Sequence, residues 1–253
     1  MKVVQLTAAN IVKDVLEGNN LNKVFQKYSK ENKINPKDLS QIKDLVFGAL
    51  RSYGKTKFVI NKLVKRPPPN LLISTLLHVA LFQLISNRSN SYTVVDQAVS
   101  ASNSVNKKYT AFINGVLRNF LRERLVILKE AERNEEAKYS YPKWWINQIK
   151  KEYPKSWKNI LDIGNSHPAL IIRVNIKKVS INNYIKGLEE HKIAHTFLGD
   201  EAILIKKPMP VDSLPGFNEG EVSIQDYGAQ LSTRLLDLKK NYNKYQSFLN
   251  SNS

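Results

Sequence analysis

The sequence predicts an all-α helical bundle over residues 1–130, followed by a small α+β domain. Two observations lead to this prediction. Apolar residues recur at helical spacing through the first 130 residues, with no convincing strand, which indicates six or seven helices. Beyond about residue 140, short runs of isoleucine and valine lie between turn residues, a pattern typical of β-strands.

Glycine and proline divide the first part of the chain into segments. Helices are expected over residues 3–16 and 21–28, and a third begins at Pro36, a residue that suits the first helical turn. Gly54 is expected to break or bend that third helix. The prolines at 67–69 should end the segment that continues it.

The segment 71–85 is apolar on nearly all sides, so we expect it to be the central buried helix. Its His78 is interpreted as a hydrogen-bonded core histidine. Two further helices are predicted over 91–105 and 110–128, with Thr110 as the N-cap of the second.

The charged segment 131–140 is the predicted connector between the two domains, and the α+β domain is assigned to residues 141–222. We expect two short helices at its start and a helix over 181–190. Four short strands are predicted in the segments "ALIIRVN", "AHTFLG", "AILIK" and "EVSIQD". Such a small sheet should carry its helices on one face.

The amino-acid composition excludes several classes of function. The chain has no cysteine, which excludes disulfides, thiolate metal sites and cysteine nucleophiles within it. No apolar run is long enough to span a membrane and no signal sequence opens the chain, so a cytoplasmic protein is expected. His191 and His195 have helical ligand spacing but lack a third ligand, so we expect no metal site.

The net charge of +17, with a pI of about 9.8, favours nucleic acid as a partner, although a lysine-rich proteome would also raise the charge. Basic residues cluster near the expected helix break, at a helix entrance and along one helix face. The candidate RNA contacts are Arg51, Lys55, Lys57, Lys107, Lys108, Arg118, Arg122 and Arg173. The alternative is that they form solvated helix faces. Trp144 and Trp145 are candidate stacking platforms, with buried packing expected for at least one of them.

Several segments resemble a known family. "FGALRSYGK", "INKLVKRP", "HVALFQL" and "AFINGVLRNFLRE" resemble the NusB-like helical RNA-binding domain. That domain occurs alone in antitermination factors and at the front of Sun-type 16S rRNA cytosine-5 methyltransferases. "YPKWWINQIKKEYP", "IIRVN", "LPGF" and "VSIQDYGAQLSTRLLDL" resemble the section that joins it to the catalytic domain of the methyltransferase.

In that family, the residues matching Gln225, Asp226 and Gln230 open the S-adenosylmethionine-binding domain, so the resemblance assigns 223–238 to its first element. The family then has a glycine-rich cofactor loop and two cysteine motifs. This sequence has none of them, and 239–253 is an unmatched polar tail. We therefore expect the catalytic Rossmann-like domain to be absent. The chain should have no catalytic residue, no cofactor and no methyl transfer by itself.

Three functions follow from the resemblance. The first is an RNA-binding front portion of a methyltransferase that recognises 16S rRNA. The second is an enzyme subunit completed in trans by a separate catalytic domain, docked on the helix whose leucine face includes Leu231, Leu235 and Leu238. The third is a NusB-like antitermination regulator that binds a nascent transcript and a ribosomal-protein partner.

Overall fold

A computed structural model describes residues 2–31, 34–87, 89–166, 168–207 and 209–235 of the chain. It divides into two compact units, Met1–Ser166 and His167–Ser253. The first unit is helical and the second combines helices with a four-stranded sheet, so the predicted fold class is confirmed.

The described residues of the first unit form ten α-helices and one 3-10 helix. These are α1 (Lys2–Leu16), α2 (Leu21–Glu31), α3 (Pro36–Arg51), α4 (Tyr53–Leu63), α5 (Leu71–Ser86), α6 (Ser91–Val105), η1 (Lys107–Tyr109), α7 (Thr110–Arg133), α8 (Glu135–Tyr139), α9 (Lys143–Glu152) and α10 (Trp157–Gly164).

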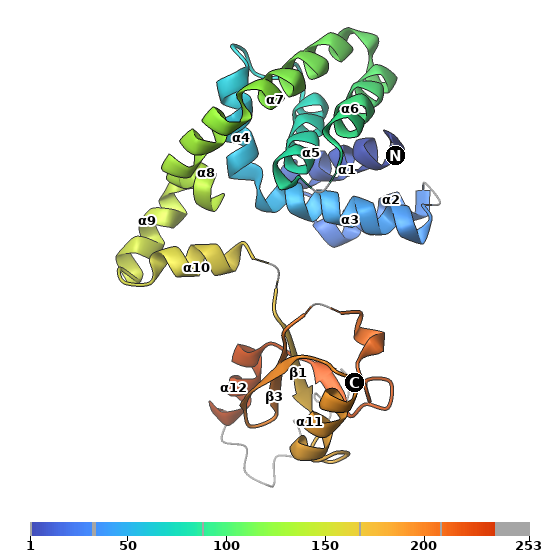
Figure 1. Cartoon of the computed structure of the whole chain (residues 1–253), viewed down its shortest axis with the longest axis vertical. Coiled ribbons are helices and arrows are strands. Elements are labelled where there is room, and N and C mark those ends of the chain that lie inside the picture. The colour runs from blue at the N-terminus through green and yellow to red at the C-terminus, as the bar shows by residue number, and fades with distance from the viewer. Residues whose placement is uncertain (1, 32–33, 88, 167, 208, 236–253) are drawn as a thin grey trace. The chain divides into compact units, whose positions relative to one another are not determined.

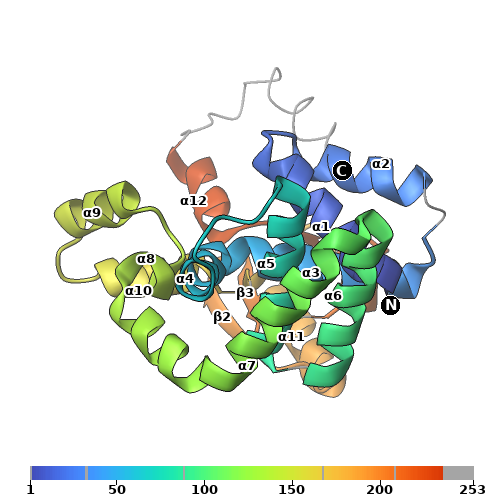
Figure 2. The same cartoon turned by 90° about the horizontal axis from the view of Figure 1, so that it is seen from above.

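The helix α5 is the centre of the bundle, as its sequence predicts. Asn70 caps its start by accepting a hydrogen bond from the backbone N–H of Ile73 at 2.9 Å. Its apolar side chains pack against α1, α3, α4, α6 and α7, which surround it in Figure 1. Figure 2 shows α7 running beside α6. Burial on all sides explains why this helix has no polar face.

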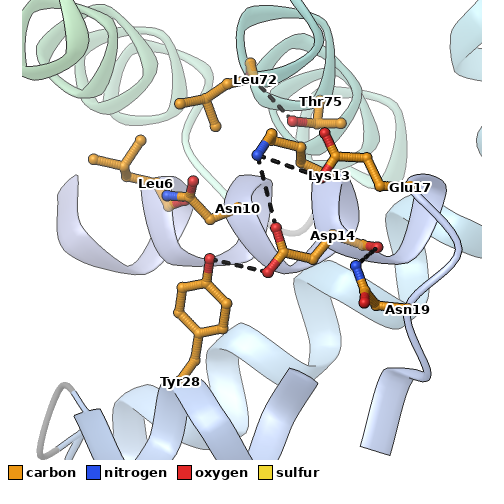
Figure 3. Close-up of polar contacts among 9 residues, drawn as sticks. All are labelled: Leu6, Asn10, Lys13, Asp14, Glu17, Asn19, Tyr28, Leu72 and Thr75. Carbon is orange, nitrogen blue, oxygen red and sulfur yellow. Dashed lines mark hydrogen bonds and ion pairs between the residues drawn. The ribbon is translucent and has the colours of Figure 1, made fainter. Parts of the chain in front are cut away.

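The contact between α1 and α2 includes a polar cluster centred on Asp14 (Figure 3). Its carboxylate accepts a hydrogen bond from the Tyr28 hydroxyl at 3.3 Å, and its backbone carbonyl accepts one from the Asn19 amide at 2.9 Å. The ammonium of Lys13 lies 3.8 Å from Asp14 and 3.5 Å from Glu17. Local carboxylates therefore balance the charge of Lys13.

The break between α3 and α4 falls at Ser52 instead of at the predicted Gly54. The Ser52 hydroxyl donates to the Gly48 carbonyl at 2.7 Å, which ends α3. Gly54 lies inside α4, where an added Cβ would be 2.4 Å from the Glu136 carbonyl oxygen and 2.8 Å from the Ser140 Cα. This glycine is required by the close approach of α4 to α8, not by a bend.

The segment 131–140 differs from the connector that its charge suggested. It forms the end of α7 and the helix α8, which Asn134 caps by accepting from the Ala137 N–H at 3.0 Å. Tyr139 of α8 is buried in a small core with Ile146 and Leu161 of the next two helices. Because this core joins α8 to α9 and α10, the first compact unit continues to Ser166.

The second unit contains an antiparallel sheet with the strand order β2-β3-β1-β4. Its elements are β1 (Leu170–Val174), α11 (Ile181–Glu190), β2 (His195–Gly199), β3 (Ala202–Ile205), η2 (Val211–Ser213), β4 (Val222–Ile224) and α12 (Tyr227–Leu235). All four strands and the helix 181–190 occur where the sequence predicts them.

The two helices of this unit lie on opposite sides of the sheet (Figure 1). Tyr184 and Leu188 of α11 pack on the face that carries Ile172 and Ile203. In contrast, α12 lies toward the face that carries Arg173, where both line one small cavity. The expectation of helices on one face only was therefore wrong, because α12 covers part of the second face.

Candidate nucleic-acid interface

Three candidate cations lie near the α3–α4 break, and the structure gives them different surroundings. The Arg51 guanidinium is 5.7 Å from the ring centre of Phe47. Lys55 forms an ion pair with Glu132 of α7 at 2.8 Å, so its charge is matched within the bundle. Lys57 is exposed, and within the described parts of the chain no carboxylate lies within ion-pair distance of it.

Beneath these residues lies His78, which confirms the predicted core histidine. Its Nδ1 is 2.5 Å from the Thr56 hydroxyl oxygen, and its ring stacks on Tyr53 with 4.4 Å between ring centres. Burial, followed by the nearby charge of Lys57, lowers the pKa of His78 to about 4. The neutral imidazole therefore connects α4 to α5 and contributes no charge to a surface.

The start of α7 differs from the predicted helix start with Thr110 as its N-cap. A 3-10 turn precedes it, and the backbone N–H groups of Lys108 and Tyr109 donate to Asn106 at 3.0 Å each. Thr110 is the first residue of α7 and not its N-cap, and its hydroxyl oxygen is buried without a hydrogen-bond partner among the described residues. The backbone amides of Lys108, Tyr109 and Thr110 are bonded within the turn, so we expect side chains to be the main groups that attract an anion here.

The side chains at this turn are well placed for that role. Lys107 and Lys108 are both exposed, and the Lys108 ammonium lies 5.0 Å from the centre of the Tyr109 ring. In the described part of the molecule, neither lysine has a carboxylate within ion-pair distance. Their charges are therefore available to a phosphate.

Arg118 and Arg122 continue the exposed cationic face along α7. The Arg118 Nε donates to Asn114 Oδ1 at 2.9 Å, and Arg122 donates to the side-chain oxygen of Asn119. These amide oxygens orient the guanidinium groups without neutralising them. Arg122 also lies 3.5 Å from Glu123, so its charge is partly matched. We call Lys107, Lys108, Arg118 and Arg122 the α7 cationic surface.

Arg173 lies in the second unit, separate from the other candidates. Its Nε donates to Glu201 Oε2 at 2.7 Å across the paired strands β1 and β3. Both residues line a small cavity of about 190 Å³, together with Tyr227 and Gln230 of α12. A half-exposed arginine in a close ion pair is a structural contact of the sheet, so it offers less charge to RNA than the α7 cationic surface does.

The family-matched residues Gln225, Asp226 and Gln230 hold α12 on the sheet. Asp226 accepts the Gly228 N–H at 2.8 Å and so caps the helix. The buried Gln230 amide donates to the Gln225 carbonyl at 3.0 Å, and the Tyr227 hydroxyl donates to the Leu198 carbonyl at 3.2 Å. Leu231 stays 37% exposed. The remaining predicted leucine contacts lie outside the side chains that the structure describes.

Trp144 and Trp145 on α9 are both exposed, at 68% and 37%. Both rings are thus exposed within the first unit, and buried packing of one of them between subdomains stays a prediction. Their rings meet edge to face with centres 5.6 Å apart. The apolar face of α9 is instead formed by Ile146 and Ile149, which enter the small core with α10.

A groove between the end of α4 and the start of α7 was not predicted. It has a volume of about 720 Å³, an apolar lining and a rim of Lys65, Arg66 and Lys108. The triple proline was predicted only to end a helix. The signal that could have revealed the groove is "VKRPPPN", in which two cations directly precede rigid, apolar proline residues.

The described residues give no support for a metal site or for a membrane-spanning helix. Among the described residues, no group of three or more His, Asp or Glu side chains is placed to hold a metal ion. In the same part of the chain, no helix combines the length and apolar character needed to cross a membrane.

Comparison with known proteins identifies both parts of the chain. Residues 2–122 match the NusB family. Residues 141–212 match the ferredoxin-like domain of RsmF/B-like methyltransferases. The crystal structure of PH0851 shares the fold, with a TM-score of 0.60 at 18% identity, and the match covers 94% of this chain and 56% of that one.

Curated relatives have a common name. A "Probable ribosomal RNA small subunit methyltransferase B" from Coxiella burnetii is 35% identical over 212 residues, covering 82% of this chain and 49% of the relative. The "Ribosomal RNA small subunit methyltransferase B" of Cronobacter sakazakii is 31% identical over 236 residues, covering 90% and 54%. The chain thus spans about half the length of the curated relatives it matches.

These findings define a NusB domain followed by a ferredoxin-like domain of the RsmF/B type. Over these two domains, the chain is similar to proteins named ribosomal RNA small subunit methyltransferase B.

Proposed function

We propose that the chain binds small-subunit ribosomal RNA, 16S rRNA, and that the α7 cationic surface contacts its phosphates. The observation that carries this proposal is the exposure of Lys107, Lys108 and Arg118, none of which forms an ion pair within the described residues. Unpaired cations release condensed counterions when they meet phosphates, which is the main source of affinity for RNA.

The distribution of ion pairs supports this placement. Lys13, Lys55, Lys62 and Lys150 each lie within 3.5 Å of a glutamate carboxylate. These ion pairs lie at the surface, and a phosphate would have to compete with a carboxylate for each of these lysines. Lys107, Lys108 and Arg118 have no such pair among the described residues, so a phosphate can reach their charges without displacing a carboxylate.

The proposed role in the cell is recognition of rRNA during its methylation. The names of the relatives support this role. The family resemblance implies S-adenosylmethionine as the methyl donor and cysteine as the nucleophile of the complete enzyme. The 253 residues contain no cysteine, so this chemistry needs a catalytic domain outside this sequence.

Three RNAs of equal length test the function by fluorescence anisotropy: a 16S rRNA fragment mixture, an antiterminator leader transcript and a transfer RNA. Preference for 16S rRNA is the expected result. Preference for the leader transcript would favour a NusB-like regulator, and the absence of any RNA binding at about 50 mM salt would contradict the proposal. The purified chain with S-adenosylmethionine should transfer no methyl group to 16S rRNA.

A further inference from the structure

The groove between the end of α4 and the start of α7 combines two kinds of surface. Tyr109, Phe112 and neighbouring apolar residues line it, and both aromatic side chains are partly exposed. Lys65, Arg66 and Lys108 stand at its rim, and all three are exposed. No acidic residue occurs among the described residues that line it.

These properties fit a particular ligand chemistry. The volume of about 720 Å³ lies within the range of small-ligand sites, roughly 300–1,000 Å³. A flat apolar group can enter against the aromatic rings while an anionic group stays at the rim. An unpaired nucleotide has both parts, since its base is flat and its phosphates are charged. An apolar peptide would match the lining but would leave the three cations without partners.

We propose that this groove binds one unpaired nucleotide of single-stranded RNA, with its base against Tyr109 and Phe112 and its phosphates near Lys65, Arg66 and Lys108. The proposal deepens the RNA-binding function and rests on it. A base held in a duplex stays stacked on its neighbours and cannot enter, so the groove selects looped or unpaired RNA.

The groove is continuous with the α7 cationic surface. Asn119 lines the groove, and its side-chain oxygen accepts a hydrogen bond from Arg122. Lys108 belongs to both, because it lines the groove and flanks Tyr109 with its ammonium 5.0 Å from the ring centre. A strand that follows α7 along these residues can therefore place one base in the groove and its neighbouring phosphates on the helix.

Gly115 provides a direct test. It lies on α7 and lines the groove, and a Cβ added there meets no other atom within 4 Å. The Cβ of Gly115→Leu therefore has room, and the leucine side chain is expected to fill part of the groove. Leucine is also the better helix former by roughly 0.5–1 kcal/mol. Gly187→Leu is the matched control, because Gly187 is helical, lies in α11 of the other unit and also has no atom within 4 Å of an added Cβ.

The experiment measures the affinity of the full chain for a 12-nucleotide single-stranded RNA and for a blunt duplex of the same sequence. Gly115→Leu should weaken single-strand binding by about 5- to 100-fold, the usual worth of one stacked base, and leave duplex binding unchanged. Gly187→Leu should bind both RNAs as the wild type does. Circular dichroism melting should show that neither substitution lowers the melting temperature.

The possible results distinguish a failure of the groove proposal from a failure of the proposed RNA-binding function. If the wild type binds both RNAs but Gly115→Leu and Gly187→Leu bind the single strand equally well, the groove proposal is wrong and RNA binding stands. Equal weakening of single-strand and duplex binding by Gly115→Leu would also overturn the groove proposal. If the wild type binds no RNA, the proposed function fails first. A second variant combines Lys65→Gln with Arg66→Gln. For single-stranded RNA, its plot of log affinity against log salt concentration should be shallower than that of the wild type by about 1.4.

Discussion

The buried imidazole of His78 makes the stability of the first unit depend on pH. Its folded-state pKa of about 4 lies below the ordinary value of 6.5, because burial opposes the charged form. The unfolded chain therefore binds more protons between these two values. The contribution of His78 to stability is complete above pH 6.5 and is lost as the pH falls toward 4.

We predict that the free energy of unfolding of the wild type falls by about 3 kcal/mol more between pH 7 and pH 4 than that of His78→Leu. Urea unfolding at the two pH values measures this difference. The direct check is an NMR titration of the His78 ring. Protonation of that ring near pH 6.5 would show that it is not desolvated as the structure describes.

The exposed Trp144 and the buried Ile146 of α9 should respond very differently to truncation. Trp144 is 68% exposed, and Ile146 is fully buried in the small core with α10. We predict that Ile146→Ala destabilises the protein by about 2–5 kcal/mol, because it leaves a cavity. Trp144→Ala should change stability by less than about 0.5 kcal/mol. Chemical denaturation of the two variants is the measurement, and similar losses would contradict the placement of α9.

At the scale of one element, α12 depends on its cap. Asp226 accepts the Gly228 N–H at 2.8 Å, and the helix is fixed to the sheet through Gln230. We predict that Asp226→Ala weakens α12 by about 1 kcal/mol, which corresponds to roughly fivefold faster amide exchange in this helix. Asp226→Asn keeps a capping oxygen and should exchange as the wild type does. Equal exchange in all three proteins would mean that the cap does not hold the helix.

The elements show what local sequence can and cannot predict. The helix 71–85 and the four strands were predicted from their own residues, because burial on all sides and alternation are local patterns. The N-cap at Thr110 was wrong, since the 3-10 turn stabilised by Asn106 replaces a simple helix start. The sequence signal for this turn is Asn106, which lies four residues before α7 begins and caps the 3-10 turn.

Pairings between distant residues account for most of the remaining differences. Lys55 was predicted as an RNA contact, and the structure pairs it with Glu132, 77 residues later, which the local sequence does not report. The groove likewise forms only when the prolines after α4 meet Tyr109 and Phe112. Periodicity within one helix does not report such contacts, so the candidate site was predicted in part and the groove was not.

For the whole molecule, the position at which the first compact unit ends predicts which fragments of the chain are stable. A fragment 1–130 removes α8, including buried Ala137 and Tyr139, and uncovers the Gly54 side of α4. We predict that a fragment 1–166 is more stable than 1–130 by about 2 kcal/mol or more, because each buried apolar side chain contributes about 1.5–3 kcal/mol. Thermal melting of the two fragments tests this, and equal melting temperatures would place the end of the unit at 130.

The proposed function requires that the α7 cationic surface binds RNA phosphates. The measurement is the salt dependence of the affinity of the full chain for 16S rRNA fragments. The test variant replaces Lys107, Lys108, Arg118 and Arg122 by glutamine. The control variant replaces the paired Lys13, Lys55, Lys62 and Lys150 by glutamine, so both variants carry the same net charge.

If the α7 cationic surface contacts phosphates, the test variant should bind more weakly, and its plot of log affinity against log salt should be shallower by about 3. The control variant should keep a slope close to that of the wild type. Equal slopes in the two variants would show that only the net charge matters and would contradict the assignment of the RNA surface to α7.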